Sequence, residues 1–271
     1  MAGRKTLLAI TAMVFALVAG DALAARCGNS GAGFNRWLAD FKREAVRAGI
    51  SQRVVNSALR GVTYDRSVIR LDRNQKHFRL SFQEFYSRRV SNLHITKGRS
   101  LIRQNASLFR KIEQRYGVPS EVIVAIWGLE TSFGANTGNK SSIRSLATLA
   151  YDCRRSDFFT NELMAALQIV QRGDMSPSQM VGAWAGELGQ TQFLATSYLK
   201  FAVDFDGNGR RDLIRSRPDA LASTANYLKA YGWRAGQSWQ PGTHNYAVLS
   251  KWNKAKVYQQ TIAVLADKIG G

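Results

Sequence analysis

Glu130 closes an apolar stretch, GVPSEVIVAIWGLETSFG, at residues 117–134. Gly117 is typical of a helix end and Pro119 of a helix start, so a new helix is expected here. The side chains of residues 122–129 are all apolar or absent, which predicts a helix buried on every face. A carboxylate at the end of such a helix needs a compensating partner or acquires a raised pKa, and a raised pKa suits a general acid. A structural ion pair is the alternative, because the chain has 38 basic residues.

A second stretch whose side chains could take part in binding or chemistry is GAWAGELGQTQFLATS, residues 182–197. Its glycines and alanines allow close backbone approach, while Glu187, Gln190 and Gln192 could reach the amides and hydroxyls of a ligand. The pattern favours a binding loop, and a tight turn between helices is the alternative.

The segment DFDGNGRRDL resembles the first part of a calcium-binding loop. Ligand positions 1, 3, 5, 7 and 9 would be Asp204, Asp206, Asn208, the Arg210 carbonyl and Asp212. Position 12 is Arg215 instead of Glu, so Asp219 would have to complete the site. We expect a structural Ca²⁺ here, with an ion-paired turn as the alternative, and no cofactor needed for chemistry.

Helices are expected to position these groups. Phe34, Trp37, Leu38 and Phe41 follow the helical period, and Gly49 ends that run. Shorter helices are expected at 54–59, 67–71 and 78–90, then at 108–116, 159–170, 221–228 and 258–269. Residues 233–252, rich in Trp and Tyr, are predicted to be loops with short strands.

The first 24 residues are predicted to be a secretory signal peptide. Arg4 and Lys5 precede an apolar run, and Ala22-Leu23-Ala24 fits a cleavage site. An exported protein without a later membrane span is expected, with an uncleaved anchor as the alternative. Removal of this segment lowers the net charge from +19 to about +18. Such a surface attracts polyanions, and export favours acidic envelope polymers over nucleic acid.

Only two cysteines occur, Cys27 and Cys153. In an oxidising compartment they are expected to form one disulfide, which would close a very long loop. Two separately buried thiols are the alternative.

These motifs together resemble the lytic murein transglycosylase B family, the family 103 glycoside hydrolases. The resemblance rests on WL..F..EA near the start, IWGLETSFG, SLATLAYDCRR, AGELGQTQF, VDFDGNG, ANYL with a following GW, and the late WN. It implies a mainly α fold, with a helical scaffold region at 25–116 and a lysozyme-like α+β catalytic core at 117–271 that includes the calcium-loop-like segment 204–219.

The resemblance also implies a reaction and a site. Members cleave the MurNAc-GlcNAc bond of peptidoglycan and leave a 1,6-anhydro ring on the muramic acid. Glu130 would be the single catalytic acid and base. The implied substrate-binding residues are Gln192, Tyr227, Asn253, Arg154 and Arg155, beside Gln190 and Glu187 of the loop. A periplasmic monomer that binds glycan strands, and other cell-wall enzymes as partners, would be expected.

One departure concerns residue 183, which is Ala here and Ser in some members. A hydroxyl at this position could hydrogen-bond the catalytic carboxyl group, so other neighbours must set the pKa of Glu130. A hydrolytic muramidase that uses Glu187 to activate water, and a catalytically silent cell-wall binding protein, are the alternative functions.

Overall fold

The chain folds as a mainly helical protein in a computed structural model that describes residues 26–74 and 80–271. The predicted signal peptide therefore lies outside the described residues. The helices are α1 Phe34–Arg47, α2 Gln52–Ala58, α3 Arg66–Arg73, α4 Phe82–Arg89, α5 Asn92–Gln104, α6 Ala106–Tyr116, α7 Ser120–Thr131, α8 Ser142–Tyr151, α9 Ser156–Arg172, α10 Ala195–Phe201, α11 Arg217–Ala230, α12 His244–Trp252 and α13 Lys256–Gly270. Short 3-10 turns occupy Gly31–Gly33 and Pro177–Gln179.

One small antiparallel sheet pairs β1 Lys140–Ser141 with β2 Val181–Gly182. Lys140 lies opposite Gly182, and Ser141 opposite Val181. In the described part of the chain no helix is long and apolar enough to cross a bilayer.

Helix α7 is the buried centre of one half of the molecule. Its residues 122–129 are all buried, as predicted from their composition. The helix follows Gly117, which ends α6 in the left-handed conformation with a φ of 71°. Helices α5, α6, α11 and α13 pack around it. This packing buries residues 122–129 and leaves Glu121 at the start of α7 and Glu130 near its end partly exposed.

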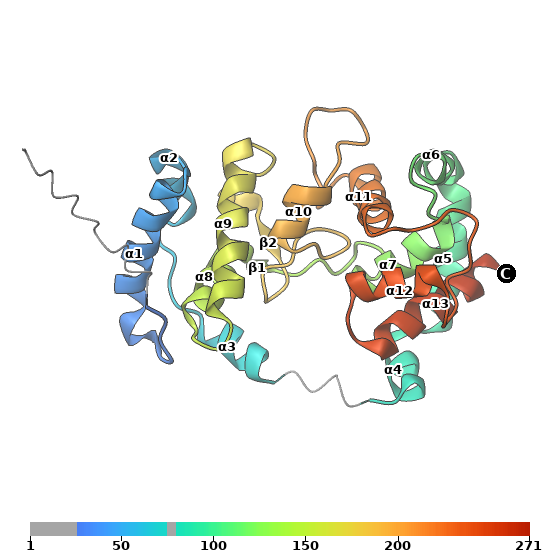
Figure 1. Cartoon of the computed structure of the whole chain (residues 1–271), viewed down its shortest axis with the longest axis horizontal. Coiled ribbons are helices and arrows are strands. Elements are labelled where there is room, and N and C mark those ends of the chain that lie inside the picture. The colour runs from blue at the N-terminus through green and yellow to red at the C-terminus, as the bar shows by residue number, and fades with distance from the viewer. Residues whose placement is uncertain (1–25, 75–79) are drawn as a thin grey trace, which may run out of the picture.

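The other half is built on α8 and α9, which pack against each other. Helices α1 and α3 cover α8, while α2 and α10 pack on α9. In Figure 1, α1 and α13 lie at opposite ends of the long axis, with the small sheet and α10 between the two halves. Helices from both sides of residue 116 thus pack together, and the expected division at this residue stays a prediction.

Two predictions about elements were wrong or incomplete. Residues 244–252, expected within a stretch of loops and strands, form α12, which begins where the Thr243 hydroxyl accepts a bond from the Tyr246 amide. Helices α5, α8 and α10 were not predicted. Only Gly98 and Leu101 are buried in α5, so its sequence shows little apolar periodicity.

Candidate active site

A cleft of about 770 Å³ contains Glu130. Six of the residues selected from the sequence line it: Glu130, Arg155, Glu187, Gln192, Tyr227 and Asn253. The other lining residues are Arg89, Phe158, Ala183, Trp184, Phe193, Leu194, Ser197, Lys251, Trp252 and Lys254. The cations of the cleft, Arg89, Arg155, Lys251 and Lys254, would favour a substrate that carries negative charge.

The Glu130 carboxyl group is held through one of its two oxygens. Its Oε1 accepts a hydrogen bond of 2.7 Å from the Tyr258 hydroxyl and one of 3.0 Å from the Trp252 indole Nε1. Oε2 accepts no hydrogen bond from the residues that the structure describes. The carboxyl group is therefore oriented by two donors while its second oxygen is left for a ligand.

Burial raises the pKa of Glu130 above the usual range of a glutamate. The two hydrogen bonds and the charge of Arg89 act in the opposite direction, because they stabilise the carboxylate. The charge of Glu187 raises the pKa further. Because its pKa is raised, Glu130 keeps its proton to higher pH and can act as an acid. Because two donors stabilise its carboxylate, it can then act as a base.

Both donors to Glu130 were missed from the sequence. Tyr258 was placed only at the start of the helix expected at 258–269, and Trp252 in the stretch 233–252 expected to form loops with short strands. The indole is fixed between Phe193 and Tyr227, with ring centroids 5.5 and 5.0 Å away. A buried tyrosine needs a partner for its hydroxyl, so Tyr258 on an apolar helix face was a signal for a buried acceptor.

The loop between β2 and α10 forms one wall of the cleft. The Ala183 amide donates to the Glu187 carbonyl, and Leu188 and Phe193 exchange two backbone bonds. A Cβ atom at Gly182 would lie 1.9 Å from the Glu187 carbonyl oxygen, so this close approach requires glycine. Gln192 has a left-handed φ of 54°, and its amide donates to the carbonyls of Thr137 and Gly189. Such strain in a non-glycine residue is common at functional sites.

Glu187 brings a second carboxyl group into the cleft. Its Oε2 is buried and has no hydrogen-bond partner among the described residues. Burial raises the pKa of Glu187, while the charge of Arg155 lowers it.

Three arginines gather around two buried aspartates where α8 meets α9. Arg155 pairs with Asp72, and Arg154 lies 3.4 Å from the same carboxylate. Arg73 bridges Asp72 and Asp152 at 2.7 Å each. The disulfide between Cys27 and Cys153 fixes the same turn. Arg155 reaches the cleft, whereas Arg154 is not among its lining residues.

The remaining selected residues differ in their position. The Tyr227 hydroxyl donates to the Lys251 carbonyl at 2.6 Å, and the Asn253 side chain accepts from the Ala255 amide at 2.9 Å. Gln190 is buried behind the cleft, where its amide donates to the Ile214 carbonyl at 3.2 Å.

The calcium-loop-like segment, residues 204–219, brings three carboxylates together. One oxygen from each of Asp204, Asp206 and Asp219 lies within 4.8 Å of the others. Asp212 instead accepts from the Arg215 guanidinium at 2.8 Å, and the Asn208 side chain accepts from the Arg210 amide at 2.9 Å. Asp219 also accepts hydrogen bonds from the backbone amides of Phe205 and Asp212. Burial raises the pKa of Asp219. Asp204 and Asp206 of the loop and Asp219 of α11 thus offer carboxylate oxygens, the kind of ligand that Ca²⁺ prefers, but fewer than its usual six to eight.

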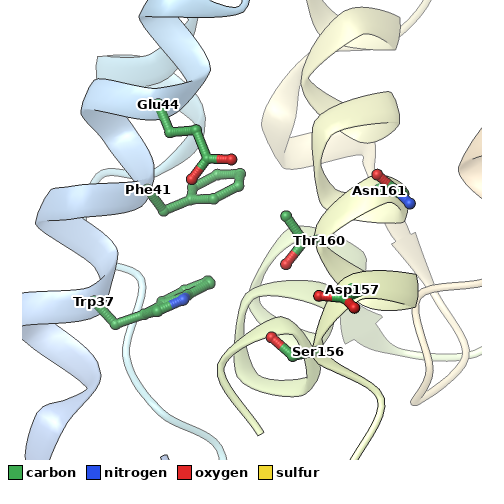
Figure 2. Close-up of a pocket in the computed structure, with 7 residues that line it drawn as sticks. All are labelled: Trp37, Phe41, Glu44, Ser156, Asp157, Thr160 and Asn161. Carbon is green, nitrogen blue, oxygen red and sulfur yellow. The ribbon is translucent and has the colours of Figure 1, made fainter. Parts of the chain in front are cut away.

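A second depression, of about 310 Å³, lies between α1 and α9. Figure 2 shows Trp37, Phe41 and Glu44 of α1 opposite Ser156, Asp157, Thr160 and Asn161 of α9. Trp37 and Phe41 are buried and offer little ring surface there. None of the residues predicted for catalysis or binding lines this depression, so the cleft at Glu130 is the better candidate site.

Comparison with known proteins gives consistent matches. A family model described as the transglycosylase SLT domain matches residues 33–243. The membrane-bound lytic murein transglycosylase B of Escherichia coli K12 is 41% identical over 124 residues. That match covers 45% of this chain but only 34% of the relative, about a third of its length.

Solved structures are similar over most of the chain. SltB3 from Pseudomonas aeruginosa, in complex with NAG-anhNAM-pentapeptide, is 34% identical with a TM-score of 0.84, over 89% of this chain and 80% of its own. The Escherichia coli lytic transglycosylase Slt35 in complex with calcium is 24% identical with a TM-score of 0.77, over 91% and 96% of the two chains. The mainly α, lysozyme-like fold expected from the sequence is confirmed by these matches.

Proposed function

Because this chain belongs to the transglycosylase SLT domain family, we propose that it is a peptidoglycan lytic transglycosylase with Glu130 as its single acid and base. The observation that supports this most directly is the state of the Glu130 carboxyl group. Tyr258 and Trp252 hold Oε1, Oε2 accepts no bond from the described residues, and burial raises the pKa.

In the first step, Glu130 donates its proton to the oxygen of the MurNAc-GlcNAc bond. The bond from C1 to that oxygen breaks, and the GlcNAc chain leaves with the new hydroxyl. The carboxylate that results is stabilised by the Tyr258 and Trp252 donors, which are already in place.

In the second step, the same carboxylate accepts the proton of the C6 hydroxyl of the muramic acid. The C6 oxygen closes on C1 and gives a 1,6-anhydro ring, and Glu130 is protonated again. The substrate supplies the nucleophile, so the second catalytic carboxylate of ordinary glycosidases is not needed.

The walls of the cleft would hold the glycan. Gln192, Tyr227 and Asn253 offer polar atoms and an aromatic face beside Glu130. Arg155 and the other cleft cations would meet carboxylates of the lactyl group or the peptide stem. The relative SltB3 was solved with a saccharide-pentapeptide, which agrees with this class of substrate.

We further propose that the protein is exported to the periplasm, acts there as a monomer on glycan strands and can join other cell-wall enzymes. A Ca²⁺ ion held by Asp204, Asp206 and Asp219 would stabilise the loop before α11 and take no part in the reaction. Support for the ion comes from the three convergent carboxylates.

A second candidate function is hydrolysis by a muramidase. It is favoured by one observation: Oε2 of Glu187, in the same cleft, has no hydrogen-bond partner among residues 26–74 and 80–271. In that reaction Glu187 would activate water, and Glu187→Gln would abolish turnover. A transglycosylase that needs no second base would keep most of its turnover.

Turnover and binding of Glu130→Gln test whether the protein is an enzyme at all. The variant should release no soluble fragments from purified peptidoglycan and should still sediment with it, because Gln keeps the shape of the side chain. Wild-type protein should do both. Equal absence of turnover in both forms, with binding retained, would indicate a silent cell-wall binding protein instead.

A further inference from the structure

The start of α9 presents an aromatic ring to the cleft. Arg155 and Phe158 both line it, three residues apart. Phe158 is 43% exposed. The neighbouring Ser156, Asp157, Thr160 and Asn161 line the depression toward α1 instead (Figure 2). The first turns of α9 therefore separate two surfaces, and Phe158 belongs to the cleft.

The exposure of Phe158 sets it apart from other apolar side chains. The large apolar residues that are exposed in the described part of the chain are Val46, Leu71, Leu93, Phe158, Val181 and Tyr231. Of these, Phe158 is the one that lines the cleft. An exposed aromatic ring in a concave site has apolar surface that a ligand can cover, whereas single exposed side chains elsewhere need no explanation.

The Phe158 ring rests on a rigid base. It contacts Phe159 edge to face, with centroids 4.9 Å apart. Phe159 is buried, and the Arg155 guanidinium lies 4.8 Å from its centroid. Arg155 is in turn paired with buried Asp72, and the Cys27–Cys153 disulfide holds the preceding turn. A platform held in this way loses little conformational entropy on binding.

This wall and the reacting carboxyl group come from different helices. Helix α9 packs on α2, α8 and α10, whereas α7, which bears Glu130, packs on α5, α6, α11 and α13. The groups that hold Glu130 come from α12 and α13. A polymer whose bond is cleaved at Glu130 must continue along the cleft past its other walls.

We propose that Phe158, with Arg155 beside it, forms an outer saccharide subsite that stacks on a sugar ring of the glycan remote from the cleaved bond. The subsite rests on the proposed function. A pyranose ring has an apolar C–H face that can cover the phenyl ring and polar edges that can accept bonds from the guanidinium. Phe158 would then set affinity for long strands and leave the chemistry at Glu130 unchanged.

Binding of N-acetylglucosamine oligomers of two to six sugars tests the subsite. The full chain carrying Glu130→Gln, here called the parent, cannot turn the oligomers over and is therefore used for calorimetry. The affinity of this parent for the oligomers should rise with their length. Adding Phe158→Ala should weaken binding of the long oligomers about tenfold, the effect of uncovering one aromatic face, and should leave the shortest unchanged.

Two further variants serve as controls. Phe158→Tyr keeps the ring and should retain the affinity for long oligomers. Leu93→Ala removes an exposed apolar side chain of α5, 68% exposed and outside the cleft, and should change nothing.

Two results would overturn the subsite alone, provided that the Glu130→Gln protein binds the oligomers. These are no effect of Phe158→Ala on the affinity at any length, and an equal loss of affinity at every length. If the parent binds no oligomer or peptidoglycan strand at all, the proposed function falls together with the subsite.

Discussion

Opposing influences act on the single carboxyl group of Glu130. Burial favours its protonated form, whereas the donors Tyr258 and Trp252 and the charge of Arg89 favour the carboxylate. Burial has the largest effect, so the pKa is raised. No hydroxyl is needed at Ala183 to orient this group, because the phenol and the indole already do so.

Tyr258→Phe tests the hydrogen bond from the Tyr258 hydroxyl to Glu130. Loss of a donor to the carboxylate should raise its pKa further, so the alkaline limb of kcat/KM against pH should move to higher pH. A hydrogen bond to a charged group contributes about 1.5–3 kcal/mol, so the rate should fall roughly tenfold to a hundredfold. A limb that stays in place or moves to lower pH would contradict this role.

Glu187→Gln should have the opposite effect on the same limb. Removal of a nearby negative charge should lower the pKa of Glu130 and move the alkaline limb to lower pH. Glu44→Gln, in the depression beside α1, is the matched control and should leave the profile unchanged. Loss of turnover at every pH in Glu187→Gln would instead favour the hydrolytic mechanism.

The sequence was informative about which residues face the cleft and less informative about their partners. Glu130, Gln192 and Glu187 stood out because they interrupt apolar or small-residue stretches. Tyr258 and Trp252 bond Glu130 from positions 128 and 122 residues away along the chain. Contacts at such separations leave no local pattern, so only the folded chain brings them together.

At the scale of elements, apolar composition predicted well where burial is complete. Helix α7 is buried along residues 122–129, as its composition required. Helix α5 could not be predicted in this way, because only Gly98 and Leu101 of its residues are buried and Leu93 is exposed. Helix α12 was mistaken for loops and strands since its aromatic residues also suit strands.

Binding of Ca²⁺ to the calcium-loop-like segment, residues 204–219, should raise the Tm of the protein. A hundredfold excess over Kd should raise Tm by roughly 5–10 °C, because an ion that binds only the folded state stabilises it. Asp219→Asn should remove this response by deleting a ligand, whereas Asp267→Asn, an exposed carboxylate on α13, should keep it. An equal response in all three proteins would argue against the site.

Across the whole molecule, the Cys27–Cys153 disulfide links the start of the described chain to the turn between α8 and α9. The bonded residues are 126 positions apart. In the chain-entropy model, closing so long a loop stabilises the fold by about 4–5 kcal/mol. Replacing both cysteines by Ala should lower the urea midpoint accordingly, and an unchanged midpoint would contradict this contribution.

The halves built around α7 and around α8 and α9 form the two sides of one cleft, where we propose that Glu130 works as the only acid and base. The mass of the fragments released from purified peptidoglycan tests this claim most directly. If Glu130 carries out both proton transfers, the products should be muropeptides with 1,6-anhydro ends, each lighter by one water than the corresponding hydrolysis product. Fragments that contain the added water would contradict it.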